Sequence, residues 1–452
     1  MKMTLIGAGG VRTPLILRAI LNRNDWLGFT SIALLDIDKK HLDLIGKVSE
    51  PVERGLKGSV EILRTTDATA ALDGADFVIT TFRVGGMEGR IMDEKLALNH
   101  GVIGQETTGP GGFAMAMRSI PVMMEYIEVM KRVCPKAWLI NFANPSGLIT
   151  EAITSRHLWD RIVGICDGPS TLWAVAASVL NASSLQDVDL EYFGLNHLGW
   201  IRSIKYQTRE CLPELLKMMQ ITGGIPGYPF KPEFLLALGL IPNEYLHYFY
   251  ASDQSLKKLK SQKKTRGEYL LECNNRLFLE LQNSSGITTQ DIYQKYLMER
   301  HATYMENFNP GNQSQGINLE RVQELAPEGY AGVALDFIEG IMGIKPGKLI
   351  LNVPNRLAIK GMDSRDVVEI PCQVNKGLVK NQPIGTIPDH CLGLMKQVKA
   401  YEKLTVEAVM EGSYQKAWLA LAIHPLVRDE AKARLILNEY IAAHHVYFPK
   451  LS

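Results

Sequence analysis

The side chains best suited to chemistry follow short apolar segments, and the first group of them is a glycine-rich turn. Gly7, Gly9 and Gly10 come directly after the apolar residues 2–6. A turn of this kind lets the backbone approach a pyrophosphate closely, and the helix that follows directs its N–H groups at the same phosphates. The match to the dinucleotide-binding pattern G-x-G-x-x-G is imperfect, because Thr13 stands where a third glycine would follow Gly10.

A carboxylate strengthens this interpretation. Asp36 ends the next apolar segment, residues 30–35. In a Rossmann unit a carboxylate at this position binds the ribose 2′-hydroxyl of NAD and disfavours the 2′-phosphate of NADP. A tight turn without a cofactor is the alternative, and Asp36 favours the NAD-binding turn over it.

Three further groups of polar residues follow later apolar segments. Arg83 lies on a glycine-containing loop, where its guanidinium could bind an anionic group of a substrate or remain an ordinary surface charge. Residues 101–113, which include Glu106, are rich in glycine and threonine, and we predict a loop folded around a ligand rather than a packed core. Asn144 places an amide before a proline turn, near a predicted strand end.

Cys166 and His197 form a candidate metal pair from two different predicted domains. The cysteine follows the apolar residues 161–165, and the histidine lies in the segment 194–198, Gly-Leu-Asn-His-Leu. A thiolate and an imidazole are both ligands for divalent metal ions. Their spacing matches no zinc-finger rule, so from these two residues alone a buried structural cysteine and a core histidine are the stronger interpretation.

The elements that must position these residues alternate between strand and helix in the first third of the chain. Helices are predicted over 13–22 and from residue 39, and strands at 2–6, 32–35, 61–64, 76–82, 137–142 and 161–166. This alternation is typical of a parallel sheet with helices on both faces, in which ligands bind beyond the carboxyl ends of the strands. We therefore predict an α/β fold with a Rossmann dinucleotide-binding domain over residues 1–169.

The pattern changes in the rest of the chain. Strands are predicted at 188–193, 198–205 and 366–373, a loop at the Pro- and Gly-rich residues 223–229, and helices over 390–412 and 413–445. We predict a mixed α+β domain over residues 170–452 that resembles the second domain of lactate and malate dehydrogenases. This domain would carry the substrate, metal and subunit contacts.

Composition excludes several classes of protein. Lysine and arginine total 49 against 48 aspartates and glutamates, a net charge of +1, so no nucleic-acid partner is indicated. No apolar run reaches the length of a membrane span, and we expect no membrane contact. The 6 cysteines show no C-x-x-C spacing and no secretion signal is evident, which predicts reduced thiols in a cytoplasmic protein.

Together these segments resemble a known family. The glycine turn, RVGG, GVIGQETTGPGGF, NPSG, CDGP, GLNHL and IPNEY occur in this order, and the resemblance spans essentially the whole chain. They resemble the NAD-dependent and divalent-metal-dependent glycosidases of glycoside hydrolase family 4, most of all the 6-phospho-β-glucosidases. That family is an exception to the two-carboxylate mechanism of most glycosidases.

The resemblance implies a redox-assisted route to cleavage of the glycosidic bond. NAD+ takes a hydride from C3 of the sugar, the ketone acidifies the C2 proton, and a metal ion polarises the oxygens. A base removes the C2 proton, the C1 group is eliminated, water adds, and NADH returns the hydride. The expected substrates are 6-phospho-β-glucosides such as phosphorylated disaccharides, and the expected assembly is a homodimer or homotetramer.

The resemblance also implies roles for individual residues near the metal. Cys166 and His197 would hold the ion, with Mn2+ expected although a Cys–His pair alone suggests zinc. Tyr245 would be the C2 base, with Tyr248 as the fallback because the register of the tyrosine-rich stretch is open. Asp167 occupies the position of the general acid in α-acting phospho-enzymes, where many β-acting members have asparagine.

Substrate and cofactor contacts follow from the same resemblance. Arg83 and Arg266 would bind the 6-phosphate, and an ordinary helix-surface charge is the alternative for Arg266. The resemblance also implies that Glu106 is one of the substrate-binding residues. Asn144 would contact the sugar or the nicotinamide.

Other functions stay open. A 6-phospho-α-glucosidase, favoured by Asp167, or another family 4 glycosidase is the first alternative. A dehydrogenase of the lactate/malate type would instead reduce NAD in step with substrate. A catalytically inactive NAD sensor would have no need of Cys166, His197 and Tyr245.

Overall fold

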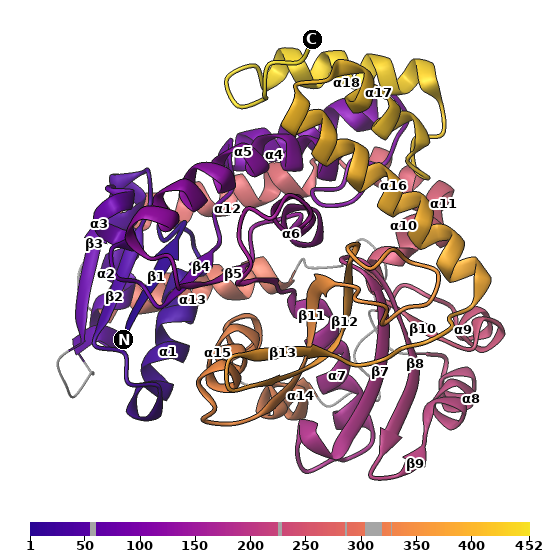
Figure 1. Cartoon of the computed structure of the whole chain (residues 1–452), viewed down its shortest axis with the longest axis horizontal. Helices are drawn as coiled ribbons and strands as arrows, with labels where there is room; N and C mark the ends of the chain where they lie inside the picture. The colour runs from indigo at the N-terminus through magenta and orange to yellow at the C-terminus, as the bar shows by residue number, and fades with distance from the viewer. Residues whose placement is uncertain (55–59, 225–227, 285–286, 303–318, 327) are drawn as a thin grey trace. The chain divides into compact units, whose positions relative to one another are not determined.

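The computed structural model describes residues 1–54, 60–224, 228–284, 287–302, 319–326 and 328–452 (Figure 1). Its contacts divide the chain into two units. The first unit comprises Met1–Ile165, Ser261–Ala302 and Ala400–Ser452, and the second comprises Cys166–Lys260 and Thr303–Lys399. The expected domain boundary after residue 169 stays a prediction, whereas the first change between contact units falls after Ile165.

The first unit contains a parallel sheet with the strand order β3-β2-β1-β4-β5-β6. The strands are β1 (Lys2–Ile6), β2 (Ser31–Leu35), β3 (Glu61–Thr65), β4 (Phe77–Thr80), β5 (Trp138–Asn141) and β6 (Ile162–Gly164). This is the Rossmann strand order, which reverses between β1 and β4. The glycine turn after β1 and the Arg83 loop after β4 therefore flank the point where ligands bind in such sheets.

The helices of the first unit pack in two groups. In one, α2 (Lys39–Arg54) contacts α1 (Thr13–Leu27), α12 (Arg266–Gln282) and α13 (Ile287–Ala302). A buried cluster joins α2, α12 and α13, and it consists of Leu44, Val48, Cys273, Leu277, Leu281, Tyr293 and Tyr296. Each such side chain contributes about 1.5–3 kcal/mol when buried, which explains why α12 and α13 return to this unit.

The second group includes the chain's C-terminal end. In it α5 (Pro110–Val133) contacts α3 (Ala68–Leu72), α4 (Gly86–Asn99) and α6 (Ser146–Ser155), while α4 also contacts α12 and α18. The helix expected over 413–445 is two helices, α17 (Tyr414–Ile423) and α18 (Glu430–Ala443), after α16 (Asp389–Glu411). Pro425 explains the break, because the residue before a proline disfavours the helical conformation.

The second unit contains an antiparallel sheet with the order β10-β8-β7-β12-β11, with β13 beside β12 and β9 beside β8. The strands are β7 (Val188–Leu195), β8 (Leu198–Tyr206), β9 (Arg209–Glu210), β10 (Ile241–Pro242), β11 (Gly347–Pro354), β12 (Val367–Asn375) and β13 (Leu378–Asn381). The strands expected near β7, β8 and β12 are confirmed. β11 was not predicted from the sequence.

The helices of the second unit are α7 (Asp167–Val179), α8 (Leu212–Thr222), α9 (Pro232–Leu238), α10 (His247–Tyr250), α11 (Ser252–Ser261), α14 (Leu319–Leu325) and α15 (Gly329–Met342), with short 3-10 turns η1 (Leu185–Asp187) and η2 (Glu244–Leu246). Part of the loop expected at 223–229 lies outside the described residues. Among the described helices, none combines the length and apolar character needed to cross a membrane.

Candidate functional site

The glycine-rich turn connects β1 to α1. Gly7 has a φ of +91°, and a Cβ at this position would lie 2.6 Å from the backbone nitrogen of Phe82. Only glycine therefore fits where the turn passes the loop that follows β4. Arg12, the N-cap residue of α1, makes no side-chain capping hydrogen bond. The dipole of α1 places partial positive charge at this N-terminus, which suits an external phosphate.

Asp36 lies beside this turn at the end of β2. Its Oδ2 accepts a hydrogen bond of 2.7 Å from the nitrogen of Gly9, and its Oδ1 accepts one of 2.9 Å from the nitrogen of Asp38. The carboxylate is thus held where a Rossmann unit places its ribose-binding group. These residues fit a dinucleotide. The roles of Gly7, Gly9, Gly10, Thr13 and Asp36 in binding NAD stay a proposal.

Residues 101–109 form a loop, as predicted, but most of this segment is buried, so the expectation that it avoids the packed core was wrong, and its contact with a ligand stays a prediction. Residues 102–104 and 107–113 are buried, and α5 already begins at Pro110. A Cβ at Gly104 would collide with the backbone carbonyl of Glu94 in α4. The glycine content of this motif therefore serves close packing of the chain against its own backbone.

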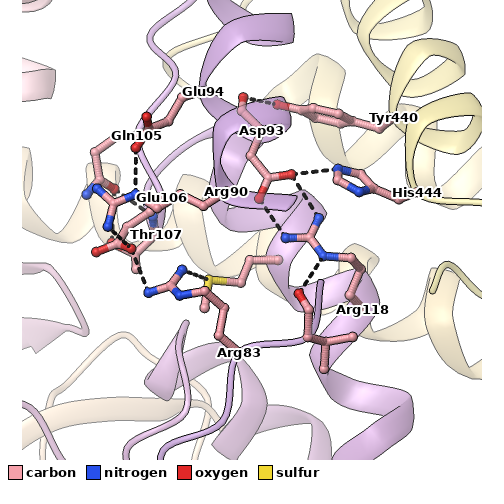
Figure 2. Close-up of polar contacts among 12 residues, drawn as sticks. Arg83, Arg90, Asp93, Glu94, Gln105, Glu106, Thr107, Arg118, Tyr440 and His444 are labelled. Carbon is pink, nitrogen blue, oxygen red and sulfur yellow. Dashed lines mark hydrogen bonds and ion pairs between the residues drawn. The ribbon is translucent and has the colours of Figure 1, made fainter. Parts of the chain in front are cut away.

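Arg83 and Glu106 lie in a cluster of charged side chains (Figure 2). Nη2 of Arg83 is 2.7 Å, and Nη1 of Arg90 is 2.6 Å, from the same Oε2 atom of Glu106. Burial works to raise the pKa of Glu106, but the guanidinium groups of Arg90 and Arg83 outweigh it and bring the pKa to about 2. Glu106 is thus the counterion of two arginines. Its expected contact with substrate stays a prediction.

Arg90 and Glu94 belong to this cluster and were missed from the sequence. Nε of Arg90 donates to Oε1 of Glu94 at 2.7 Å, and Oε2 accepts from the nitrogen of Gly267 at 2.8 Å. Glu94 therefore ties α4 to the start of α12, where Arg266 lies. Burial first, and then the charges of Arg90 and Arg300, lower the pKa of Arg266, so several guanidinium groups share this region. The i, i+4 spacing of Arg90 and Glu94 was the available signal.

Cys166 and His197 lie together in the second unit, although the expected boundary after residue 169 separates them. Sγ of Cys166 is 3.4 Å from Nε2 of His197. Cys166 is the N-cap residue of α7, and His197 occupies the two-residue loop between β7 and β8 with a φ of +61°. A non-glycine residue in the left-handed region is uncommon, and such conformations cluster at functional sites. The topology thus brings a thiol and an imidazole to one point.

The chemistry of this pair fits a divalent metal ion. Burial first, and then the carboxylates of Glu369 and Asp167, raise the pKa of the Cys166 thiol well above its usual range. A nearby cation would favour the thiolate, which is the form that binds metals. Within the ranges that the structure describes, no group of three or more His, Cys, Asp or Glu forms a metal site.

Tyr245 stacks on the same histidine. The ring centroids of Tyr245 and His197 are 3.9 Å apart, with an angle of 5° between the ring planes. Tyr245 lies in η2, and its backbone nitrogen donates a hydrogen bond of 2.9 Å to Oδ1 of Asn243, the N-cap residue. The ring centroid of Tyr248 is 6.5 Å from that of Tyr245. Tyr245 is thus in contact with a proposed metal ligand, and its role as the base stays a prediction.

Glu369 is a buried carboxylate whose place beside this group the sequence did not reveal. It accepts hydrogen bonds from Tyr192 at 2.9 Å, Asn196 at 3.1 Å and Asn352 at 2.9 Å. Burial raises the pKa of Glu369 to about 7, against the effect of these hydrogen bonds. Because Asn196 precedes His197 in the hairpin loop, Glu369 helps to hold that loop. The sequence signal for a buried carboxylate was Glu369 itself, a single acidic residue within the apolar strand β12.

Asn144 follows β5 and is partly buried, and its peptide bond to Pro145 is cis. The neighbouring amide, Asn141, is fully buried and accepts a hydrogen bond of 2.9 Å from Oγ1 of Thr80. Asn141 is therefore a structural residue that joins β4 and β5. The contact of Asn144 with sugar or nicotinamide stays a prediction.

The order of the parallel sheet and its glycine turn place the chain in the class of Rossmann-fold proteins. A family model described as Family 4 glycosyl hydrolase matches residues 2–182, and the model of the Family 4 glycosyl hydrolase C-terminal domain matches residues 192–427. The chain therefore belongs to glycoside hydrolase family 4, as its motifs indicated.

Similar proteins carry both anomeric names. The chain is 30% identical over 459 residues to the "Probable 6-phospho-beta-glucosidase" of Bacillus subtilis (strain 168), covering 100% of this chain and 98% of the relative. The 6-phospho-beta-glucosidase of Thermotoga maritima, solved with manganese, NAD+ and glucose-6-phosphate, has a TM-score of 0.84, 28% identity and full coverage of both chains. A 6-phospho-alpha-glucosidase from gut microorganisms, solved with NAD and Mn2+, has a TM-score of 0.85 and 27% identity, covering 100% and 99%.

The likeness to dehydrogenases concerns the fold alone. A lactate dehydrogenase from Eimeria maxima has a TM-score of 0.51 and 14% identity, and covers 91% of this chain and 98% of that one. The predicted fold class is confirmed by this likeness and by the solved family 4 structures.

Proposed function

We propose that this chain hydrolyses 6-phosphoglucosides with NAD and Mn2+ as cofactors. The 6-phospho-β-glucosides are the leading candidate substrates. The observation that carries the proposal is the group of Cys166, His197 and Tyr245, with 3.4 Å between the thiol and the imidazole and the phenol ring stacked on the latter. A family 4 member that keeps all three side chains together retains what the redox-assisted elimination requires. An NAD sensor would not need them.

Each group of residues has a distinct task in this proposal. When bound, NAD would accept a hydride from the sugar and later return it, and the metal ion would polarise the sugar oxygens as a Lewis acid. Cys166 and His197 would hold the ion, and Tyr245 would take the C2 proton of the sugar. The glycine turn with Asp36 would orient the dinucleotide. The small-molecule substrate, an assembly of two or four copies and a cytoplasmic location belong to the same proposal.

Asp167 supports α-glucosides as the second candidate. Its Oδ1 lies 4.0 Å from Sγ of Cys166, so a carboxylate stands beside the proposed metal ligands. A carboxylic acid at this place could protonate a leaving group, which asparagine cannot. Rates with p-nitrophenyl α- and β-glucosides and galactosides, each with and without a 6-phosphate, decide between the anomers and epimers.

Activity is expected to require NAD+ in catalytic amounts, with no net reduction. Hydride removed from the sugar returns to it within one turnover, so absorbance at 340 nm should stay flat while p-nitrophenol is released. The control is the same assay without NAD+, which should show no release after bound cofactor is removed. A rise at 340 nm in step with substrate consumption would instead favour the dehydrogenase alternative.

Arg83→Ala and Arg266→Ala are expected to lose selectivity for 6-phosphorylated substrates. The charges of Arg83, Arg90 and Arg300 act on Glu106, and those of Arg90 and Arg300 act on Arg266. Glu94 and Asp93 are further carboxylates of this region. The excess positive charge suits a phosphate, and each lost charge-assisted contact should cost about 2–4 kcal/mol in kcat/KM. Arg276→Ala, an exposed arginine of the same helix α12, is the matched control. Equal wild-type rates on phosphorylated and unphosphorylated glucosides would refute the phosphate role.

A further inference from the structure

A second, fully buried polar network lies next to the Arg83–Glu106–Arg90 cluster (Figure 2). Arg118 of α5 is 0% exposed and binds Asp93 of α4 through two hydrogen bonds, Nη1 to Oδ1 at 2.8 Å and Nη2 to Oδ2 at 2.6 Å. The third nitrogen, Nε, donates to the backbone carbonyl of Val84 at 3.1 Å. One guanidinium thus connects α5, α4 and the residue that follows Arg83.

The C-terminal helix joins the same network. Nε2 of His444 is 2.8 Å from Oδ1 of Asp93, and the Tyr440 hydroxyl donates to the backbone carbonyl of Asp93 at 2.8 Å. The exposed fractions of Asp93, Tyr440 and His444 are 1%, 0% and 2%. The end of the chain is therefore anchored on α4, within one helical turn of Arg90 and Glu94.

Stability alone is a weak explanation for this arrangement. Removing two charges from water costs several kcal/mol per ion, and a buried ion pair seldom stabilises a fold more than apolar side chains of the same size would. Its geometric effect is more specific. Gly85, the N-cap residue of α4, has no side chain to hold the loop after Arg83, whereas Arg118 binds that loop at Val84 and binds α4 at Asp93.

We propose that Arg118 and Asp93 are positioning residues for the Arg83–Arg90 pair, and that α18 takes part through Tyr440 and His444. The network sets the distance between the loop that carries Arg83 and the helix that carries Arg90, and it thereby preorganises both guanidinium groups for an anion. The proposal rests on the proposed function, because it takes the anion to be the 6-phosphate of the substrate.

Arg118→Lys tests the proposal because it keeps the buried positive charge and removes the planar guanidinium group with its several N–H donors. An ammonium group cannot reproduce two parallel bonds to a carboxylate together with a third bond to a carbonyl. Binding of glucose 6-phosphate to the NAD-loaded variant, measured by isothermal titration calorimetry, is expected to weaken about tenfold or more. The KM for 6-phosphorylated p-nitrophenyl glucoside should rise with it, while kcat and the Kd of NAD change by less than about threefold.

Tyr440→Phe is a milder variant in case Arg118→Lys does not fold. It removes one hydrogen bond to Asp93, and it should weaken glucose 6-phosphate binding about fivefold. Tyr293→Phe is the matched control, because Tyr293 is also 0% exposed and its hydroxyl also donates to a backbone carbonyl, that of Val11 at 2.7 Å. The control should leave glucose 6-phosphate binding to the NAD-saturated enzyme unchanged.

Two outcomes would overturn the proposal. Folded Arg118→Lys and Tyr440→Phe variants could bind glucose 6-phosphate with the wild-type Kd, or both could weaken NAD and glucose 6-phosphate binding equally, as a general loss of stability would. The proposed function fails separately, if the wild type does not bind glucose 6-phosphate or Arg83→Ala binds it as tightly as the wild type.

Discussion

Replacing His197 by alanine is expected to lower turnover at saturating Mn2+ by at least about three orders of magnitude, while the Kd of NAD stays within about twofold. His197 and Cys166 are adjacent donors in the second unit, with 3.4 Å between Nε2 and Sγ. Loss of either leaves one protein ligand, and the Lewis-acid contribution to the barrier is several kcal/mol. The glycine turn that we propose to bind NAD belongs to the first unit, in which this substitution changes no residue.

Cys166→Ser should behave like His197→Ala, and the chain offers a matched control. Cys391 is a buried cysteine of the second unit whose Sγ lies 3.3 Å from Nε2 of His390. Cys391→Ser therefore also replaces a buried cysteine beside a histidine by serine. The enzyme with this substitution should retain its metal ion and its activity. Elemental analysis after gel filtration gives the metal content. Full metal occupancy in both Cys166→Ser and His197→Ala would contradict the assignment.

Tyr245→Phe is expected to lower kcat by about two to four orders of magnitude, which is the usual contribution of a positioned general base. The substitution removes one hydroxyl and retains the ring that stacks on His197 at 3.9 Å, so the fold and the stacking contact should persist. Hydrolysis by the wild type in D2O should place deuterium at C2 of the sugar product. A two-carboxylate glycosidase would not give that result, because it never breaks the C2–H bond.

Loss of C2 exchange in Tyr245→Phe distinguishes a base from a residue that only binds substrate. Tyr248→Phe is the control, because Tyr248 lies close by and its ring centroid is 6.5 Å from that of Tyr245. It should exchange C2 at the wild-type rate. If instead Tyr245→Phe exchanges normally and Tyr248→Phe does not, the base is Tyr248 and the fallback register is correct.

Local patterns in the sequence were sufficient for most of the parallel sheet. β1, β2 and β4 are short apolar runs that end at a glycine turn, an aspartate and the Arg83 loop. Strands that are buried on both faces of a parallel sheet consist of such apolar runs, so these strands and their order along the chain can be predicted from the sequence. The start of α1 at Thr13 was also predictable, because Pro14 is favoured in the first turn of a helix.

Other parts of the fold depend on segments that meet only in three dimensions. α12 and α13 return to the first unit through an apolar cluster with α2, far away in the sequence. In the motif at 101–113, Gly104 is required by the close approach of the backbone of Glu94. No local pattern reports such a contact, because the contact depends on the path of the other segment.

The sequence by itself determined the residue types of the proposed site and their places at strand ends and turns. The glycine turn and Asp36 were identified from a local motif, whereas the roles of Cys166, His197 and Tyr245 came from the family resemblance. Only the tertiary structure showed that Glu106 pairs with Arg83 and Arg90, that Tyr245 stacks on His197, and that Asp93 binds His444. The physical reason is that the role of a charged or aromatic side chain depends on the groups packed around it. Its burial and its distances to those groups are set only when segments far apart in the sequence fold together.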